Sequence, residues 1–291
     1  MVEVHDKGDL TYGILPHLAA EIEEAGLLGL VERCDFLYQQ AFYANAELAI
    51  LFDLKKAPGE YEREVICAPC FFTCVGIALA DACFMNCARL FDGGGNVTVG
   101  TFLEMCASMT GEIDSRACEV YRDRPDFDDK KPIRHPLTPD EERFYPQQDV
   151  KLQRCDDQLF GGGHCEPVFV NMTASDLVEL WQKRYSGLGK LIERLRRQRN
   201  KVFAHNDAAT LDYESFVSKC PLTFGEMQRL IDFALGITIE TVAIVVGDNR
   251  PRLPRNIGDL RGLLNYVDVG MEAVEQQAED LRAGRLAMGD L

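Results

Sequence analysis

Residues 15–54 read LPHLAAEIEEAGLLGLVERCDFLYQQAFYANAELAILFDL, and this stretch decides the fold class. Its apolar side chains recur at steps of three and four residues, which is the period of an α-helix with one buried face. The positions that carry this period are Leu18, Ile22, Leu27, Leu28, Val31, Phe36, Leu37, Phe42, Leu48 and Leu51. The pattern predicts one long helix, or two in succession, ending at Ala57-Pro58-Gly59.

The same period predicts helices along most of the remaining chain. They cover residues 61–91, a segment through 102–105 capped by Thr98 or Thr101, residues 173–205, residues 223–246 and residues 260–286. Residues 111–172 differ, because proline, glycine and charged residues crowd this region and predict an irregular insertion with short local structure at most. Convincing alternating strand patterns are absent. We therefore expect an all-α helical bundle forming one continuous domain, with long N-terminal helices in 1–110, a loop-rich insertion in 111–172 and C-terminal helices in 173–291.

Composition sets the class of protein. The chain has 291 residues, of which 46% are hydrophobic and 27% charged, as in an ordinary globular protein. No continuous apolar run reaches the roughly 18 residues that cross a bilayer, and the acidic N-terminus does not resemble a signal peptide. We expect a cytoplasmic protein with no membrane partner, whose 11 cysteines stay reduced and pack as small hydrophobic side chains.

The charge of the chain is unevenly distributed. The formal net charge is −16, yet the segment from Trp181 to His205 holds eight basic residues and one acidic residue. That segment carries +7, so the rest of the chain carries −23. A strongly acidic body argues against indiscriminate coating of nucleic acid, and the focused basic segment predicts a local anion-binding site.

A single helix over 188–206 would separate this segment into two faces. Leu188, Ile192, Leu195 and Val202 form an apolar stripe that Arg199 interrupts, and a guanidinium on such a face needs a partner. The second face is basic and ends in a histidine; it consists of Arg194, Arg197, Lys201 and His205. The alternative interpretation is a solvated basic face whose histidine caps the end of the helix.

Arginine and histidine suit the cleavage of a phosphodiester without a metal or another cofactor. Imidazole titrates near pH 6.5 and can exchange a proton near neutrality. Arginine binds phosphate through two N–H groups and stabilises developing negative charge, and RNA supplies its own nucleophile in the 2′-hydroxyl. Six residues on an ideal helix put Arg199 and His205 about 120° apart, so two copies meeting across a dimer axis would complete the site.

The sequence RNKVFAHND at 199–207 resembles the Arg-x(4–6)-His motif of the HEPN superfamily, in particular its abortive-infection U-type branch. ARLFD at 88–92 followed by NVT at 96–98 adds to that resemblance. It implies an all-helical homodimer joined through the motif helix, a metal-independent ribonuclease acting on RNA as a toxin or phage-defence effector, and an antitoxin or other defence protein as a further partner. Carried over, Arg199 would hold the scissile phosphate, Asn200 would orient the histidine and His205 would be the acid and base. With that resemblance, Arg89 and Asp92 would line the cleft and support His205; the alternative is a surface ion pair at i,i+3 spacing. Arg194, Arg197 and Lys201 would bind the substrate.

Two alternative functions stay open at this point. A catalytically silent HEPN module would use the same basic face to bind nucleotide or RNA, or to scaffold a defence complex. A metal-dependent enzyme would use cysteine and histidine residues of the insertion, namely Cys155, His164 and Cys165 with Cys118 or His135, although their spacing is poor for zinc. Cys67-Ala-Pro-Cys70, with Cys74, also invites a metal or redox interpretation, but its helical spacing in an apolar segment favours core packing.

Overall fold

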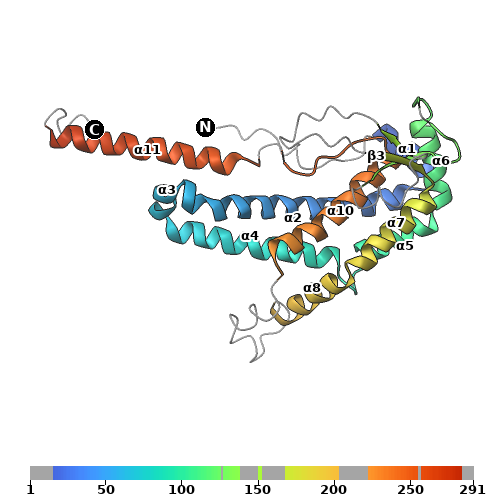
Figure 1. The fold of residues 1–291 in the computed structure, drawn as a ribbon, viewed down its shortest axis with the longest axis horizontal. Coiled ribbons are helices and arrows are strands. Elements are labelled where there is room, and N and C mark those ends of the chain that lie inside the picture. Colours follow the sequence, from blue (N-terminus) through green and yellow to red (C-terminus); the bar gives the residue numbers. More distant parts are fainter. Residues whose placement is uncertain are drawn as a thin grey trace. The chain divides into compact units, whose positions relative to one another are not determined.

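A computed structural model describes residues 16–125, 127–137, 150–152, 168–202, 222–254 and 257–283. Within these ranges the chain forms ten helices and one small sheet (Figure 1). The fold is therefore all-α, as the sequence predicts. The helices are α1 (Pro16–Glu24), α2 (Leu28–Glu60), α3 (Glu62–Cys67), α4 (Pro69–Leu90), α5 (Val99–Ser108), α6 (Thr110–Tyr121), α7 (Ala174–Gly187), α8 (Gly189–Val202), α10 (Phe224–Val245) and α11 (Asp259–Arg282).

The N-terminal stretch folds as two helices in succession, one of the two arrangements expected. Helix α1 ends in a Schellman motif, in which Gly26 N–H bonds to the carbonyl of Glu23 and Leu27 N–H to that of Ile22. Gly26 has a φ of +74°, a left-handed conformation that glycine adopts at little cost. Helix α2 then continues past Pro58 to Glu60, so the predicted end at Ala57-Pro58-Gly59 was a few residues early.

Two predicted helices are each divided in the structure. The helix expected over 61–91 breaks at Ala68, because the residue before a proline is driven out of the helical region. The helix expected over 173–205 breaks at Leu188, which lies between Gly187 and Gly189. Its predicted part beyond Val202 lies outside the described residues.

Two predicted helix starts, at Thr98 and at Thr173, are confirmed by capping boxes. Thr98 caps α5 in a capping box with Thr101, and Thr173 caps α7 in a capping box with Asp176. In each box the threonine hydroxyl accepts a backbone N–H, and the side chain three residues later accepts the threonine's own N–H.

The region expected to be an irregular insertion contains regular structure, so that expectation was wrong in part. Its first residues lie in α6, and three antiparallel strands follow in the order β1-β3-β2. These are β1 (Ile133–Leu137), β2 (Val150–Leu152) and β3 (Val168–Met172). In β1 the side chains of Ile133, His135 and Leu137 are buried in alternation. Pro136 is tolerated there because β1 is an edge strand.

The chain divides into two compact units built from discontinuous segments, which do not follow the three consecutive segments read from the sequence. Unit 1 comprises the described parts of Met1–Tyr38, Gly93–Lys190 and Gly236–Arg250. Unit 2 comprises those of Gln39–Asp92, Leu191–Leu235 and Pro251–Leu291. Each unit has its own fully buried side chains, such as Phe102 and Leu177 in unit 1 and Leu48 and Leu195 in unit 2.

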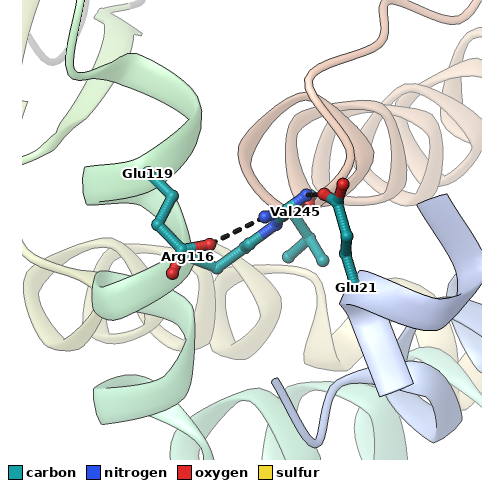
Figure 2. Close-up of polar contacts among 4 residues, drawn as sticks. All are labelled: Glu21, Arg116, Glu119 and Val245. Atoms are coloured by element: carbon teal, nitrogen blue, oxygen red, sulfur yellow. Dashed lines mark hydrogen bonds and ion pairs between the residues drawn. The ribbon is translucent and has the colours of Figure 1, made fainter. Parts of the chain in front are cut away.

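In unit 1 a buried arginine joins three helices (Figure 2). Arg116 of α6 donates from Nε to the carbonyl of Val245 at the end of α10, at 3.0 Å. Its two terminal nitrogens pair with Glu21 of α1 at 3.0 Å and with Glu119 of α6 at 2.7 Å. Lys or Arg side chains commonly satisfy the last carbonyls of a helix in this way.

In unit 2 the α3 joint lets α4 return along α2 (Figure 1). The Cys83 thiol donates to the carbonyl of Ala44, and Asn86 donates to the carboxylate of Glu47. These contacts place the last third of α4 against α2, where Cys83, Phe84 and Cys87 are buried.

The length and composition of α4 correct the expectation that no segment is apolar enough to span a membrane. The residues of α4 before Cys83 are exposed or half-buried. Within the described residues, α4 alone passes that test by length and composition, and 17% of its most apolar 18-residue window is buried. Small apolar residues raise its average hydropathy without forming an unbroken run of large side chains. A single helix of this kind is also compatible with a soluble protein.

Candidate functional site

Helix α8 carries the described part of the motif and belongs to unit 2 from Leu191 onward. Leu191, Ile192 and Leu195 are buried and anchor one face of the helix. Apart from Arg199, its charged residues lie on the other sides, as expected for a helix with one apolar stripe. Phe203 to Asp207, including the proposed acid and base His205, lie outside the described residues, so the relation between Arg199 and His205 stays a prediction.

Arg199 is paired, as its position in the apolar stripe requires. Its Nη1 atom lies 2.5 Å from Oδ2 of Asp92, the residue that follows α4 by two positions. Its Nε and Nη2 atoms donate to Oδ1 of the neighbouring Asn200, at 3.1 and 2.8 Å. The side chains of Arg199 and Asp92 are 27% and 31% exposed, so the guanidinium is held in place yet still reachable from solvent.

The structure thus brings three of the predicted site residues together. Asp92, just after α4, and Arg199 of α8 are far apart in sequence, and Asn200 turns its side-chain oxygen toward Arg199. The resemblance implies that Asn200 orients His205. Because His205 lies outside the described residues, this role stays a prediction.

The other arginines of α8 also have partners within the chain. Arg194 pairs with Glu226 of α10, and Arg197 pairs with Glu193 one turn earlier on α8. Arg196 donates from Nε to the carbonyl of Phe91 at 2.8 Å, next to Asp92. Lys201 lies within α8, but its side chain is not among those described. The predicted basic face is therefore partly neutralised by nearby carboxylates.

Glu226 is a site residue that the sequence reading missed. It forms a capping box with Thr223 at the start of α10, with Thr223 N–H donating to its Oε2 atom. That backbone N–H, and then the Arg194 guanidinium, lower the pKa of the Glu226 carboxyl below its usual value. The capping box could have been predicted, because Thr223-x-x-Glu226 has the required spacing. The ion pair with Arg194 could not, since nothing in the sequence connects the two residues.

Arg89 sits one turn before Asp92 in a second polar group. Its Nη1 atom donates to Oδ1 of Asn86 at 3.5 Å, and Asn86 donates to both carboxylate oxygens of Glu47, at 3.1 and 3.0 Å. Burial raises the pKa of Glu47, against the opposing effects of the Asn86 hydrogen bond and the Arg89 charge. Polar side chains therefore follow the end of α4 toward Arg199: the donors Asn86 and Arg89, and then the carboxylate of Asp92.

The histidine of the second candidate cluster is fully engaged in protein contacts. His135 of β1 is buried; its Nδ1 atom contacts Oε1 of Glu240, and its Nε2 atom lies 3.2 Å from Nη2 of Arg184. Because arginine only donates, the hydrogen bond from Arg184 makes Nε2 an acceptor, and Nδ1–H then donates to Glu240. Trp181 Nε1 donates to the other Glu240 oxygen at 3.3 Å. Cys155, His164 and Cys165 lie outside the described residues.

The exposed cysteines contradict the expected core packing. Cys67, Cys70 and Cys74 are exposed, whereas Cys83 and Cys87 are buried. Periodicity places all five in one apolar segment, but only the last part of α4 is covered by α2. Among the described residues, no group of three or more histidine, cysteine, aspartate or glutamate side chains is arranged to hold a metal ion.

Comparison with known proteins gives no match to a protein-family model, to a curated protein or to a solved structure. The likeness to the HEPN superfamily therefore rests on the short motifs of the sequence alone, and it enters below as part of a proposal.

Proposed function

We propose that the protein is a metal-independent endoribonuclease that cuts RNA at a site containing Arg199 and His205, and that it acts as a toxin or phage-defence effector. The observation that carries this proposal is the Arg199 guanidinium, held by Asp92 and Asn200 while 27% of its side chain stays exposed. An arginine fixed by a carboxylate and an amide is pre-organised to receive a phosphate group.

The donor count of Arg199 supports phosphate binding. A guanidinium has five N–H groups. Among contacts between described residues, Asp92 and Asn200 engage Nη1, Nε and Nη2, using three of these N–H groups. The remaining pair suits two oxygens of one phosphate, because arginine and phosphate match in a two-pronged geometry.

The proposed reaction proceeds through the RNA's own 2′-hydroxyl. His205 accepts the 2′-hydroxyl proton as its oxygen attacks the adjacent phosphorus, and Arg199 stabilises the charge that builds on the phosphate oxygens. The 5′-oxygen then leaves and takes a proton, producing a 2′,3′-cyclic phosphate and a 5′-hydroxyl. Because an ideal helix through both residues would present the two side chains about 120° apart, the proposed complete site includes two copies of the chain, joined through the motif helix.

RNA cleavage by the purified full-length chain in the presence of EDTA tests this proposal. We expect cleavage with 2′,3′-cyclic phosphate ends, and a loss of at least about a hundredfold in kcat for His205→Ala and for Arg199→Ala. Arg261→Ala is the matched control: Arg261 also pairs with an aspartate, Asp53, but lies on α11. Circular dichroism establishes that each variant remains folded. Full activity in both motif variants would overturn the proposal.

The partners of α8 favour a second candidate function, a silent HEPN module that binds nucleotide or RNA, or scaffolds a defence complex. Glu226, Glu193 and Asp92 each pair with an arginine of the helix, so a polyanion must compete with a carboxylate at these three arginines. This candidate predicts salt-sensitive binding without turnover. The same cleavage assay, run beside a binding titration, separates the two.

A further inference from the structure

Three exposed cysteines surround the joint between α3 and α4. Cys67 is the last residue of α3, Cys70 is the second residue of α4, and Cys74 lies one turn further along α4. The structure describes all three as thiols outside any disulfide. The proposed ribonuclease site makes no use of them, and their exposure leaves them open to reagents in solution.

The helical backbone is interrupted between Cys67 and Cys70, at Ala68. Ala68 has φ −140° and ψ 57°, and its N–H bonds back to the carbonyl of Val65 at 3.3 Å. Pro69 then begins α4 with a fixed φ. The distance between the two cysteines is therefore not fixed by one continuous helix.

Cys70 and Cys74 are in a different position, because both lie inside the continuous helix α4. Residues four apart on a helix have Cβ atoms about 5–6 Å from each other, while a disulfide needs about 3.5–4.5 Å. Closing that pair would unwind a turn of α4. A disulfide between Cys67 and Cys70 would instead close across the existing interruption at Ala68.

Cys67 also takes part in holding α11. Its thiol lies 3.5 Å from the sulfur of Met271, and Arg63 pairs with Glu275. Cys67 follows Arg63 by four residues on α3, and Met271 precedes Glu275 by four on α11. The two contacts are therefore successive turns of one antiparallel helix pair. Most of α11 is exposed, with Leu264 its buried residue, so these contacts matter for its docking.

We propose that Cys67 and Cys70 form a reversible disulfide by exchange with low-molecular-weight disulfides, and that its formation releases α11 from α3. The inference is independent of the ribonuclease proposal. The Cys67 thiolate attacks a disulfide RSSR, forms a Cys67–S–S–R bond and expels RS⁻; the Cys70 thiolate then attacks the Cys67 sulfur and expels the second RS⁻. The two protons lost by the cysteines pass to the two RS⁻ groups, so the dithiol is oxidised by two electrons and RSSR is reduced to two RSH.

The buried cysteines serve as internal references for this reaction. Burial raises the pKa of Cys106 to about 12 and that of Cys34 well above its usual value. A hydrogen bond with Cys83, together with burial, raises the pKa of Cys87. These groups hold their protons and resist exchange.

The test equilibrates the full-length chain in glutathione and glutathione-disulfide mixtures, traps the remaining thiols by alkylation and maps the disulfides by mass spectrometry. We expect a Cys67–Cys70 bridge that reverses with reduced glutathione. Cys67→Ser and Cys70→Ser each abolish it, whereas Cys74→Ser, an exposed cysteine on the same helix, leaves it intact. A bridge involving Cys74, or bridges between chains only, would overturn the proposal.

The consequence for α11 is read out by hydrogen exchange on the oxidised and reduced chain. We expect the amides of 263–279 to exchange at least about tenfold faster after oxidation, while those of α5 keep their rate. The Cys67→Ser variant, which can form neither the Cys67–S–S–R mixed disulfide nor the bridge, shows no change with oxidant. Equal protection of α11 in both redox states would refute its release even where the disulfide forms.

Discussion

Asp92 Oδ2 lies 2.5 Å from Nη1 of Arg199 and joins the end of the α4 segment to the last turn of α8. The pair brings together residues that are 107 positions apart in the sequence. It satisfies a guanidinium on an otherwise apolar stripe, and it places a negative charge beside the N–H groups that remain for a phosphate. Asp92 therefore positions Arg199 and also repels an anionic substrate.

Asp92→Asn separates these two effects. Removing one negative charge beside Arg199 should strengthen RNA binding at low salt about two- to fivefold, a modest change because both side chains are partly exposed. Cleavage should fall roughly tenfold, because the guanidinium is held less firmly. Binding titrations and single-turnover kinetics measure the two quantities. Weaker RNA binding by the variant would show that Asp92 acts in positioning alone.

Arg116→Met should destabilise unit 1 by about 2 kcal/mol. The substitution keeps much of the buried volume but removes the donor to the Val245 carbonyl, and a hydrogen bond to a charged group is worth about 1.5–3 kcal/mol. Glu119→Gln should cost less than about 1 kcal/mol, because that carboxylate is more than half exposed. Urea unfolding followed by circular dichroism gives both values. Equal losses of unfolding free energy in the two variants would show that the ion pair, and not the hydrogen bond to the carbonyl, stabilises the unit.

Glu226→Gln should lower stability in a pH-dependent way. The folded-state pKa of Glu226 is lowered, so its ionised form contributes stability at pH values above the ordinary glutamate pKa of about 4.3, and this contribution is lost as the pH falls through the lowered value. The difference in unfolding free energy between the wild type and the variant should be largest near pH 7. A difference that stays constant down to the acid range would contradict the assignment.

His135→Leu should cost about 2–3 kcal/mol of stability. The substitution fills the space of a buried imidazole but leaves Glu240 and Arg184 without the ring between them. Arg134→Ala is the neighbouring control, since Arg134 stacks over the ring of Phe169 on the partly exposed side of the sheet and should cost about 1 kcal/mol or less. Thermal unfolding compares the two. A smaller loss of stability for His135→Leu than for Arg134→Ala would show that the His135 hydrogen bonds do not stabilise the sheet.

Periodicity was sufficient for the helices because their hydrogen bonds and apolar faces repeat within the local sequence. The caps at Thr98 and Thr173 followed from the same local rules. The small sheet was missed because β1 and β3 pair across more than thirty residues. The β1 sequence, Ile133 to Leu137, also hides its alternation behind an arginine, a histidine and a proline.

The candidate site divides in the same way. The sequence by itself determined that Arg199 occupies an apolar stripe and needs a partner, since that depends only on helical spacing from Leu195. Only the tertiary structure decided that the partner is Asp92, that Glu226 takes Arg194, and that Cys67 and Cys70 are exposed while Cys83 is buried. The helical period shows which side chains share a face of a helix. The segment that covers this face is distant in sequence, so its identity depends on how the whole unit packs.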